Sequence, residues 1–137
     1  MKRIRKSRDK LQQLSALMKD DHRNMVIVMQ DIPDPDAIAA AAALREIGNE
    51  VAGLTCTLAH GGPVDRAENR ALVKYLGLNL RDLNEVDEGK FDLIAMVDTQ
   101  PETGNNSLGD VFVPAIVIDH HPIRRASRKA VFTDVRS

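Results

Sequence analysis

The sequence predicts an α/β fold: a doubly wound, mostly parallel sheet with helices on both faces. Its apolar runs are continuous and lack polar alternation, as in strands that are buried on both faces of a parallel sheet. Segments with helical features separate these runs. Aromatic residues make up only 3% of the chain and Trp is absent, so the core must consist mainly of aliphatic side chains and Met. That inventory favours helices packed on a sheet.

The first predicted element is an amphipathic helix over residues 5–20, in which apolar residues from Leu11 to Met18 recur at helical spacing. We expect residues 1–23 to form this N-terminal helix and residues 24–137 to form one α/β domain. A chain of 137 residues with 43% hydrophobic residues is long enough for one domain with a core of its own.

Two further helices are predicted between the strands. An Ala-rich helix from Pro35 to Ile47 is expected to end at Gly48, and a helix from Val64 to Leu76 is expected to end at Gly77. Glycine at these positions can adopt the left-handed conformation that closes helices. The predicted strands are residues 24–29, 51–57, 91–97 and 115–118.

Composition excludes several classes of protein. The single cysteine, Cys56, cannot form an internal disulfide, and we expect it to be an inert core thiol in a reducing compartment. No apolar run is long enough to span a membrane and no signal peptide is recognisable, so a soluble cytoplasmic protein is expected. A net charge of −1 excludes a generally cationic nucleic-acid binder, although basic residues crowd both ends of the chain.

Acidic and imidazole side chains follow three of the predicted strands. Asp34 and Asp36 come after the first strand, Asp98 after the third, and His120 and His121 after the fourth. Each has an ordinary alternative explanation: an aspartate before a proline is a common helix start, a lone aspartate suits a turn, and histidines suit a polar loop. Because the carboxyl ends of parallel strands meet at one edge, the conjunction favours a shared site.

Divalent cations are the best explanation for such a site. Carboxylates pointed into one crevice repel each other unless cations lie between them. Oxygen ligands mixed with imidazole, without thiolate, suit Mn²⁺ first and Mg²⁺ second. Two ions about 3.5–4 Å apart can activate water and hold the oxygens of an attacked phosphate.

The motifs resemble, in order and spacing, those of DHH phosphoesterases, a superfamily that includes RecJ-like nucleases, nano-RNA and cyclic-dinucleotide phosphodiesterases, and manganese pyrophosphatases. The resemblance runs from about residue 24 to the end and identifies the region as the N-terminal part of a DHH domain. The matching segments are Pro33-Asp34-Pro35-Asp36-Ala37, Glu68-Asn69-Arg70-Ala71-Leu72, Val97-Asp98-Thr99-Gln100-Pro101, Gly104-Asn105-Asn106-Ser107-Leu108 and Asp119-His120-His121-Pro122.

The resemblance implies a ligand set for two Mn²⁺ ions, with Mg²⁺ as an alternative. Asp34 would bind the first ion, Asp36 and His120 the second, and Asp98 would bridge the two and act in catalysis. Family members commonly carry His where this chain has Gln30, although a subgroup carries Gln. A Gln carbonyl is a poorer ligand, so the first metal site is expected to be weak or differently filled.

The resemblance also implies residues for substrate. His121 would face the phosphate as a catalytic residue, and Asp119 would orient its neighbours from behind the metal ligands. Arg124 or Arg125 would meet phosphate oxygens, and Asn69 would line the crevice. Expected partners are a nucleotide or short-oligonucleotide substrate, with a homodimer as an open alternative.

The family supplies a further metal-binding Asp some tens of residues after the DHH motif and then a C-terminal substrate-binding domain. Asp134 lies too soon after the motif to be an obvious replacement. We therefore expect the sequence to be a fragment that is inactive by itself.

The expected activity is metal-dependent phosphodiesterase or phosphatase chemistry, in which metal-activated water attacks short oligonucleotides, cyclic dinucleotides or small nucleotide phosphates. A pyrophosphatase or exopolyphosphatase would use the same site on an anhydride. A degenerate module that senses nucleotides without cleaving them is the third alternative, and the glutamine at position 30 is the feature that favours it.

Overall fold

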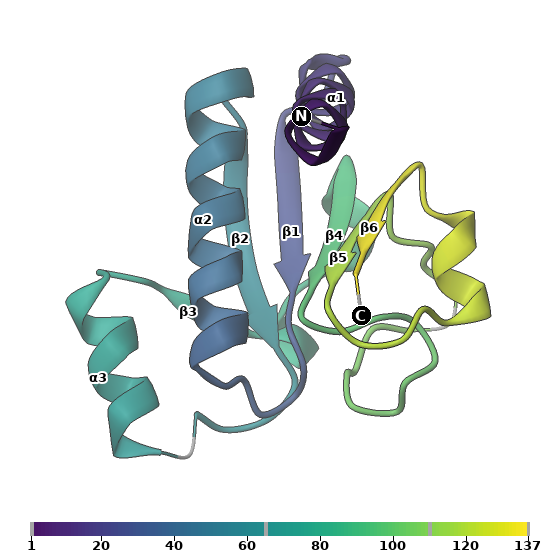
Figure 1. The fold of residues 1–137 in the computed structure, drawn as a ribbon. Coiled ribbons are helices and arrows are strands. Elements are labelled where there is room, and N and C mark those ends of the chain that lie inside the picture. Colours follow the sequence, from purple (N-terminus) through teal and green to yellow (C-terminus); the bar gives the residue numbers. More distant parts are fainter. Residues whose placement is uncertain (1, 65, 110, 137) are drawn as a thin grey trace.

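The structure is a computed structural model that describes residues 2–64, 66–109 and 111–136. Six strands form one sheet in the order β3-β2-β1-β4-β5-β6, and every neighbouring pair is parallel (Figure 1). The predicted α/β class is therefore confirmed. The strands are β1 (Asn24–Val28), β2 (Thr55–His60), β3 (Leu80–Asp82), β4 (Leu93–Val97), β5 (Ile116–Asp119) and β6 (Phe132–Val135).

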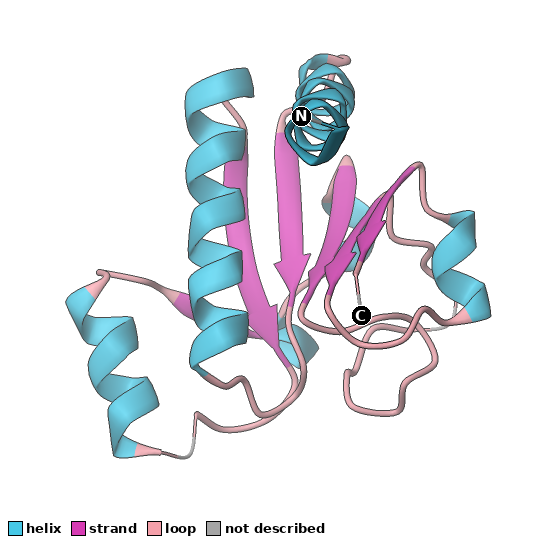
Figure 2. Ribbon diagram, in the orientation of Figure 1, coloured by secondary structure: helices cyan, strands magenta, loops and turns pink. Residues whose placement is uncertain are grey.

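The helices connect and cover these strands (Figure 2). The α-helices are α1 (Lys2–Lys19), α2 (Pro35–Ala52) and α3 (Ala67–Tyr75), and the short 3₁₀ helices are η1 (Leu83–Glu85), η2 (Glu88–Lys90) and η3 (Arg125–Lys129). Figure 1 shows α2 running along the sheet in front of β2, with β1 beside it. In the described part of the chain, none of the helices combines the length and the apolar character that crossing a membrane requires.

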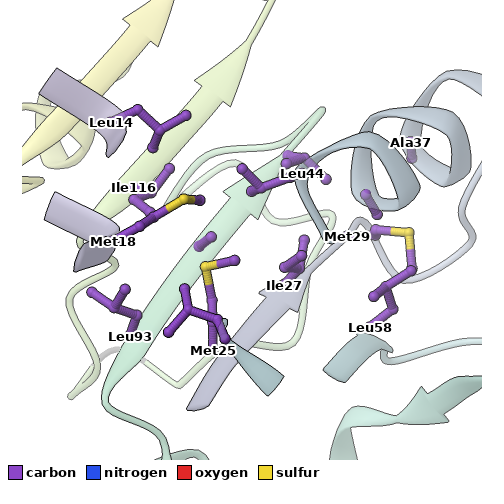
Figure 3. Packing of buried hydrophobic residues seen from close by; sticks show 14 of the residues in the cluster. Leu14, Met18, Met25, Ile27, Met29, Ala37, Leu44, Leu58, Leu93 and Ile116 are labelled. Atoms are coloured by element: carbon purple, nitrogen blue, oxygen red, sulfur yellow. The ribbon is translucent and has the colours of Figure 1, made fainter. Parts of the chain in front are cut away.

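β1 is buried on both of its faces, which explains why its sequence lacks polar alternation. Met25 and Ile27 belong to the main core between the sheet and the helices α1 and α2, where Figure 3 shows them near Leu44. Val26 and Val28 belong to a second apolar cluster, which also contains Leu83 of η1. The main core thus lies under α1 and α2, and a smaller cluster lies on the other face.

The predicted end of the second helix at Gly48 is wrong. α2 continues to Ala52 and ends at Gly53, which has φ 64° and a backbone N–H that donates to the carbonyl of Asn49 at 2.9 Å. Gly48 is instead a buried residue inside α2, where a Cβ atom would lie 3.2 Å from both Cys56 Sγ and the Met25 Cε atom. The glycine lets the helix approach the sheet closely, and β2 accordingly begins only at Thr55.

Other boundaries differ less. α3 is shorter than predicted, and Gly77 after it has φ 62°, which agrees with its predicted role as a helix stop. Two strands, β3 and β6, were not predicted, because they are short and contain charged residues, so neither forms a continuous apolar run. Cys56 is a free, half-buried thiol, and burial raises its pKa.

The strand order places a switch point between β1 and β4, from which the chain winds outward in both directions. The carboxyl ends of all strands lie at one edge of the sheet, at the bottom in Figure 1. α1 lies toward the opposite end in that view. Ligands of such sheets bind beyond the carboxyl ends at the switch point, which is where the predicted site residues come from.

Candidate metal centre

Asp98 directly follows β4 and is 4% exposed. Its backbone N–H donates to the carbonyl of Ile118 at 2.9 Å, so the pairing of β4 with β5 fixes its place. Its φ is 56°, a left-handed conformation that costs a non-glycine residue roughly 1–2 kcal/mol. Backbone strain of this kind concentrates at functional sites, and here it falls on the residue predicted to bridge two cations.

His120 follows β5 and meets Asp98. Its Nε2 atom lies 2.7 Å from Oδ1 of Asp98. The same Oδ1 atom is buried and accepts no hydrogen bond of regular geometry from the described residues, so the close imidazole nitrogen is the polar neighbour that it has there. Buried polar atoms nearly always have a well-formed partner. A divalent cation shared by the carboxylate and the imidazole fits that requirement and the chemistry of the two ligand atoms.

Asp34 serves two purposes. It is the N-cap of α2, since its Oδ1 accepts a hydrogen bond from the Ala37 backbone N–H at 2.9 Å and Pro35 begins the helix. The helix-start explanation is therefore correct for this residue. Its carboxyl group also lies beside Asp98: burial, followed by the charge of Asp34 and a hydrogen bond with it, raises the pKa of Asp98 to about 6, against the opposing effect of His120. Crowded carboxylates of this kind accommodate a cation readily.

A cavity of about 370 Å³ opens beside these groups. It joins the first turn of α2 to the ends of β4, β5 and β6, so the cavity brings the predicted ligands Asp36, Asp98 and His120 to one place. The lining residues are Asp36, Ala40, Asp98, Ile118, Asp119, His120, Asp134 and Arg136.

Asp134 and Arg136 line this cavity although the sequence analysis did not include them in the site. Asp134 lies in β6 opposite Ile118 of β5, which brings it to the carboxyl edge of the sheet. Nε and Nη2 of Arg136 donate to the two carboxylate oxygens of Asp134 at 2.7 and 2.8 Å. Both residues could have been assigned to the carboxyl edge of the sheet only if β6 had been predicted as a strand.

Asp119 is the hydrogen-bonded centre of the loop after β5. Its Oδ1 accepts from the His120 backbone N–H at 2.8 Å and from Nδ1 of His121 at 2.7 Å, and its Oδ2 accepts from Nε2 of Gln100 at 2.7 Å. Burial opposes its ionisation, but these hydrogen bonds together lower its pKa, and its contact raises the pKa of His121. The predicted orienting contact of Asp119 with His121 is present.

One ligand atom from each of Asp98, Asp119, His120 and His121 lies within 4.8 Å of the others, a spacing that could hold a metal ion. Their donor set of carboxylate oxygens and imidazole nitrogens suits Mn²⁺ or Mg²⁺.

The remaining predicted residues lie around this centre. Asn69 is buried, and its Nδ2 donates to the Pro33 carbonyl at 3.2 Å, so it holds the loop that carries Asp34. Arg124 lines a second cavity of about 450 Å³ together with His121. Gln30 is half-buried after β1. Neither Gln30 nor Arg125 is among the described residues that line these two cavities.

Comparison with known proteins agrees with this geometry. The model of the DHH family, N-terminal domain, matches residues 25–135. An uncharacterized protein of Methanocaldococcus jannaschii is 33% identical over 112 residues, which cover 82% of this chain and 22% of that protein. The chain thus spans about a fifth of the length of this relative. No solved structure matches the chain at a significant level. Since the family model covers most of the sequence and all the strand-end motifs, the chain belongs to the DHH family and contains its N-terminal domain.

Proposed function

We propose that the protein is a metal-dependent phosphoesterase that hydrolyses short oligonucleotides, cyclic dinucleotides or small nucleotide phosphates. The observation that carries this proposal is the contact of the buried Oδ1 of Asp98 with Nε2 of His120 at 2.7 Å, in a cavity that Asp36 also lines. A carboxylate oxygen and an imidazole nitrogen that meet beside further carboxylates form a donor set that suits a divalent cation.

Asp34, Asp36, Asp98 and His120 are the proposed ligands of two Mn²⁺ ions, with Mg²⁺ as the alternative, and Gln30 is a proposed weak ligand of the first. When bound, such a pair supplies an activated water molecule and Lewis acidity toward the phosphate. Asp98 reaches this position from the centre of the sheet, so it is the proposed bridge between the ions.

His121 is the proposed catalytic residue that faces the phosphate. Its Nδ1 points to Oδ1 of Asp119 at 2.7 Å. An ionised carboxylate only accepts hydrogen bonds, so Nδ1 must carry a proton and Nε2 is the nitrogen that remains for substrate. The contact raises the pKa of His121, which favours an imidazolium able to stabilise charge that develops on phosphate oxygens.

Arg136 is a stronger proposed phosphate contact than Arg125, because Arg136 lines the cavity that Asp36, Asp98 and His120 also line. Asp134 holds the guanidinium through Nε and Nη2, which leaves the donors of Nη1 and one donor of Nη2 for an anion. Arg124 remains a proposed contact on the side of His121.

Hydrolysis by the full-length protein tests the proposal. Linear dinucleotides, cyclic dinucleotides, pyrophosphate and triphosphate are incubated with Mn²⁺ or Mg²⁺, and released nucleoside monophosphate and orthophosphate are quantified. We expect release of nucleoside monophosphate by the wild type and none by Asp98→Ala. Turnover confined to pyrophosphate or triphosphate would show that the protein hydrolyses phosphoanhydrides and would contradict the proposed phosphoesterase activity. Absence of turnover with every substrate, with Asp98→Ala indistinguishable from wild type, would refute catalysis at this site.

A further inference from the structure

Gln100 is a completely buried residue, 0% exposed, in the loop after β4. Its Nε2 donates to Oδ2 of Asp119 at 2.7 Å and to the carbonyl of Pro122 at 3.1 Å. Its Oε1 accepts from the Arg124 backbone N–H and from the Ser127 hydroxyl, each at 2.8 Å. A side-chain amide has two donor hydrogens and two acceptor lone pairs, so the whole capacity of this amide is used.

These partners permit one orientation of the amide. Rotating it by half a turn would place the carbonyl oxygen of Gln100 against the carboxylate of Asp119, and the NH₂ group against the Arg124 N–H. Both contacts would then be repulsive, and leaving buried polar groups unsatisfied costs about 1–3 kcal/mol for each group. The surroundings therefore fix the direction in which Gln100 presents its donor.

The orientation of Gln100 determines the orientation of Asp119. A carboxylate is planar, so holding Oδ2 with the Gln100 donor sets the direction of Oδ1. That second oxygen accepts from Nδ1 of His121 at 2.7 Å and from the backbone N–H of His120 at 2.8 Å. A continuous chain of hydrogen bonds thus runs from the amide after β4 to both histidines after β5.

We propose that Gln100 is a positioning residue: through Asp119 it fixes the ring and the tautomer of His121 and the loop conformation that presents His120 to the metal centre. The part that concerns the metal rests on the proposed function. The part that concerns the His121 tautomer does not, because the hydrogen bonds that link Gln100, Asp119 and His121 involve protein groups alone.

The test uses three variants of the whole protein. Gln100→Glu is isosteric but replaces the donor that faces Asp119 with a second carboxylate. The double variant Gln100→Glu/Asp119→Asn restores the contact between positions 100 and 119 with donor and acceptor exchanged, since the introduced amide can donate to the introduced carboxylate and its oxygen can still accept from His121. The donor to the Pro122 carbonyl is not restored. Gln12→Glu, an exposed site on α1, is the matched control for the added charge.

Two readouts separate positioning from general destabilisation. The tautomer of His121 is read from the ¹⁵N chemical shifts of its ring at a pH where the ring is neutral, without metal. Mn²⁺ affinity is read by electron paramagnetic resonance of the free ion. We expect Gln100→Glu to shift His121 away from the Nδ1–H tautomer and to weaken Mn²⁺ binding roughly 10- to 100-fold, the usual effect of losing a residue behind a metal ligand. Gln12→Glu should match wild type, and the double variant should regain the Nδ1–H tautomer.

An unchanged tautomer together with Mn²⁺ affinity within twofold of the Gln12→Glu control would overturn the proposal. If Gln100→Glu does not fold, the tautomer of His121 in the double variant decides: the Nδ1–H tautomer supports positioning, and loss of that tautomer rejects it. If the wild type binds no Mn²⁺, the proposed function fails, and the tautomer measurement still decides the role of Gln100.

Discussion

The imidazole Nε2 of His120 lies 2.7 Å from the carboxylate Oδ1 of Asp98, although the two residues follow different strands of the sheet. The parallel pairing of β4 with β5 brings them together, since Val97 is in register with Ile118. A buried carboxylate oxygen thus meets an imidazole nitrogen, and both atoms can serve as metal ligands.

Replacing Asp98 should remove metal binding. We expect Asp98→Asn to weaken Mn²⁺ binding at least about tenfold, because even residues behind metal ligands typically contribute that much. Electron paramagnetic resonance of free Mn²⁺ measures the change. Asp9→Asn, which alters the same charge on the exposed surface of α1, is the control. Equal Mn²⁺ affinity of the Asp98→Asn and Asp9→Asn variants would show that no ion is held by Asp98.

Replacing Arg136 should weaken substrate binding more than it slows turnover. A charge-assisted hydrogen bond contributes about 1.5–3 kcal/mol, so Arg136→Met should raise KM on the order of tenfold or more. Arg136→Lys keeps the charge but loses the planar guanidinium that Asp134 holds. Its KM should lie between those of the wild type and Arg136→Met. Steady-state kinetics with a substrate found active provide the measurement. Arg8→Met on α1 is the control, and a KM for Arg136→Met equal to that control would argue against phosphate contact.

Truncating the centre of β1 should destabilise the fold without touching the site. Ile27 is 0% exposed in the main core, and Ile27→Ala should lower the free energy of unfolding by roughly 2–5 kcal/mol, because a cavity remains. Urea denaturation followed by circular dichroism measures the loss. Val131→Ala, at a residue that is 77% exposed, should change stability by less than about 0.5 kcal/mol. Similar midpoints for the two variants would contradict the described core.

Asp92 should make stability depend on pH. Its Oδ2 accepts from the backbone N–H groups of Arg23 and Asn24 at 2.7 and 3.0 Å, and these hydrogen bonds lower its pKa. The unfolded chain therefore binds the proton at a higher pH than the folded protein. The stabilisation is complete above the ordinary carboxyl pKa of about 3.9 and is lost as the pH falls through the lower folded value.

The Asp92→Asn variant cannot lose a charge on acidification at this position. We expect the difference in free energy of unfolding between wild type and Asp92→Asn to be largest near neutral pH and to shrink below about pH 4. Denaturation curves across that range measure the difference, with Asp20→Asn at an exposed position after α1 as the control. A difference that stays constant on acidification would show that the two hydrogen bonds do not favour the ionised carboxylate.

The sequence by itself determined the α/β class and indicated which strand ends meet at the candidate site. Apolar runs without alternation identified β1 and β4. A strand that is buried on both faces needs apolar residues at successive positions, and its own sequence displays that pattern directly. Asp36, Asp98 and His120 could be grouped because strand ends in a parallel sheet share one edge, whatever the details of packing. The structure places all three along one cavity.

Only the tertiary structure decided the features that depend on distant partners. Gly48 resembles a helix stop in the sequence, but it lies inside α2, where Met25 and Cys56 of two different strands leave little room for a side chain. β6 is short and interrupted by polar residues, so it forms no apolar run in the sequence. The pairing of β6 with β5 is what brings Asp134 and Arg136 to the site.

The role of Gln100 is the clearest example of a feature that the local sequence does not reveal. Its hydrogen-bond partners lie 19 to 27 residues further along the chain, and no local pattern distinguishes it from a polar loop residue. Periodicity and strand-end position are local properties that a sequence displays directly. The pairing of buried polar groups is set by packing between elements, and it therefore became visible only in the folded chain.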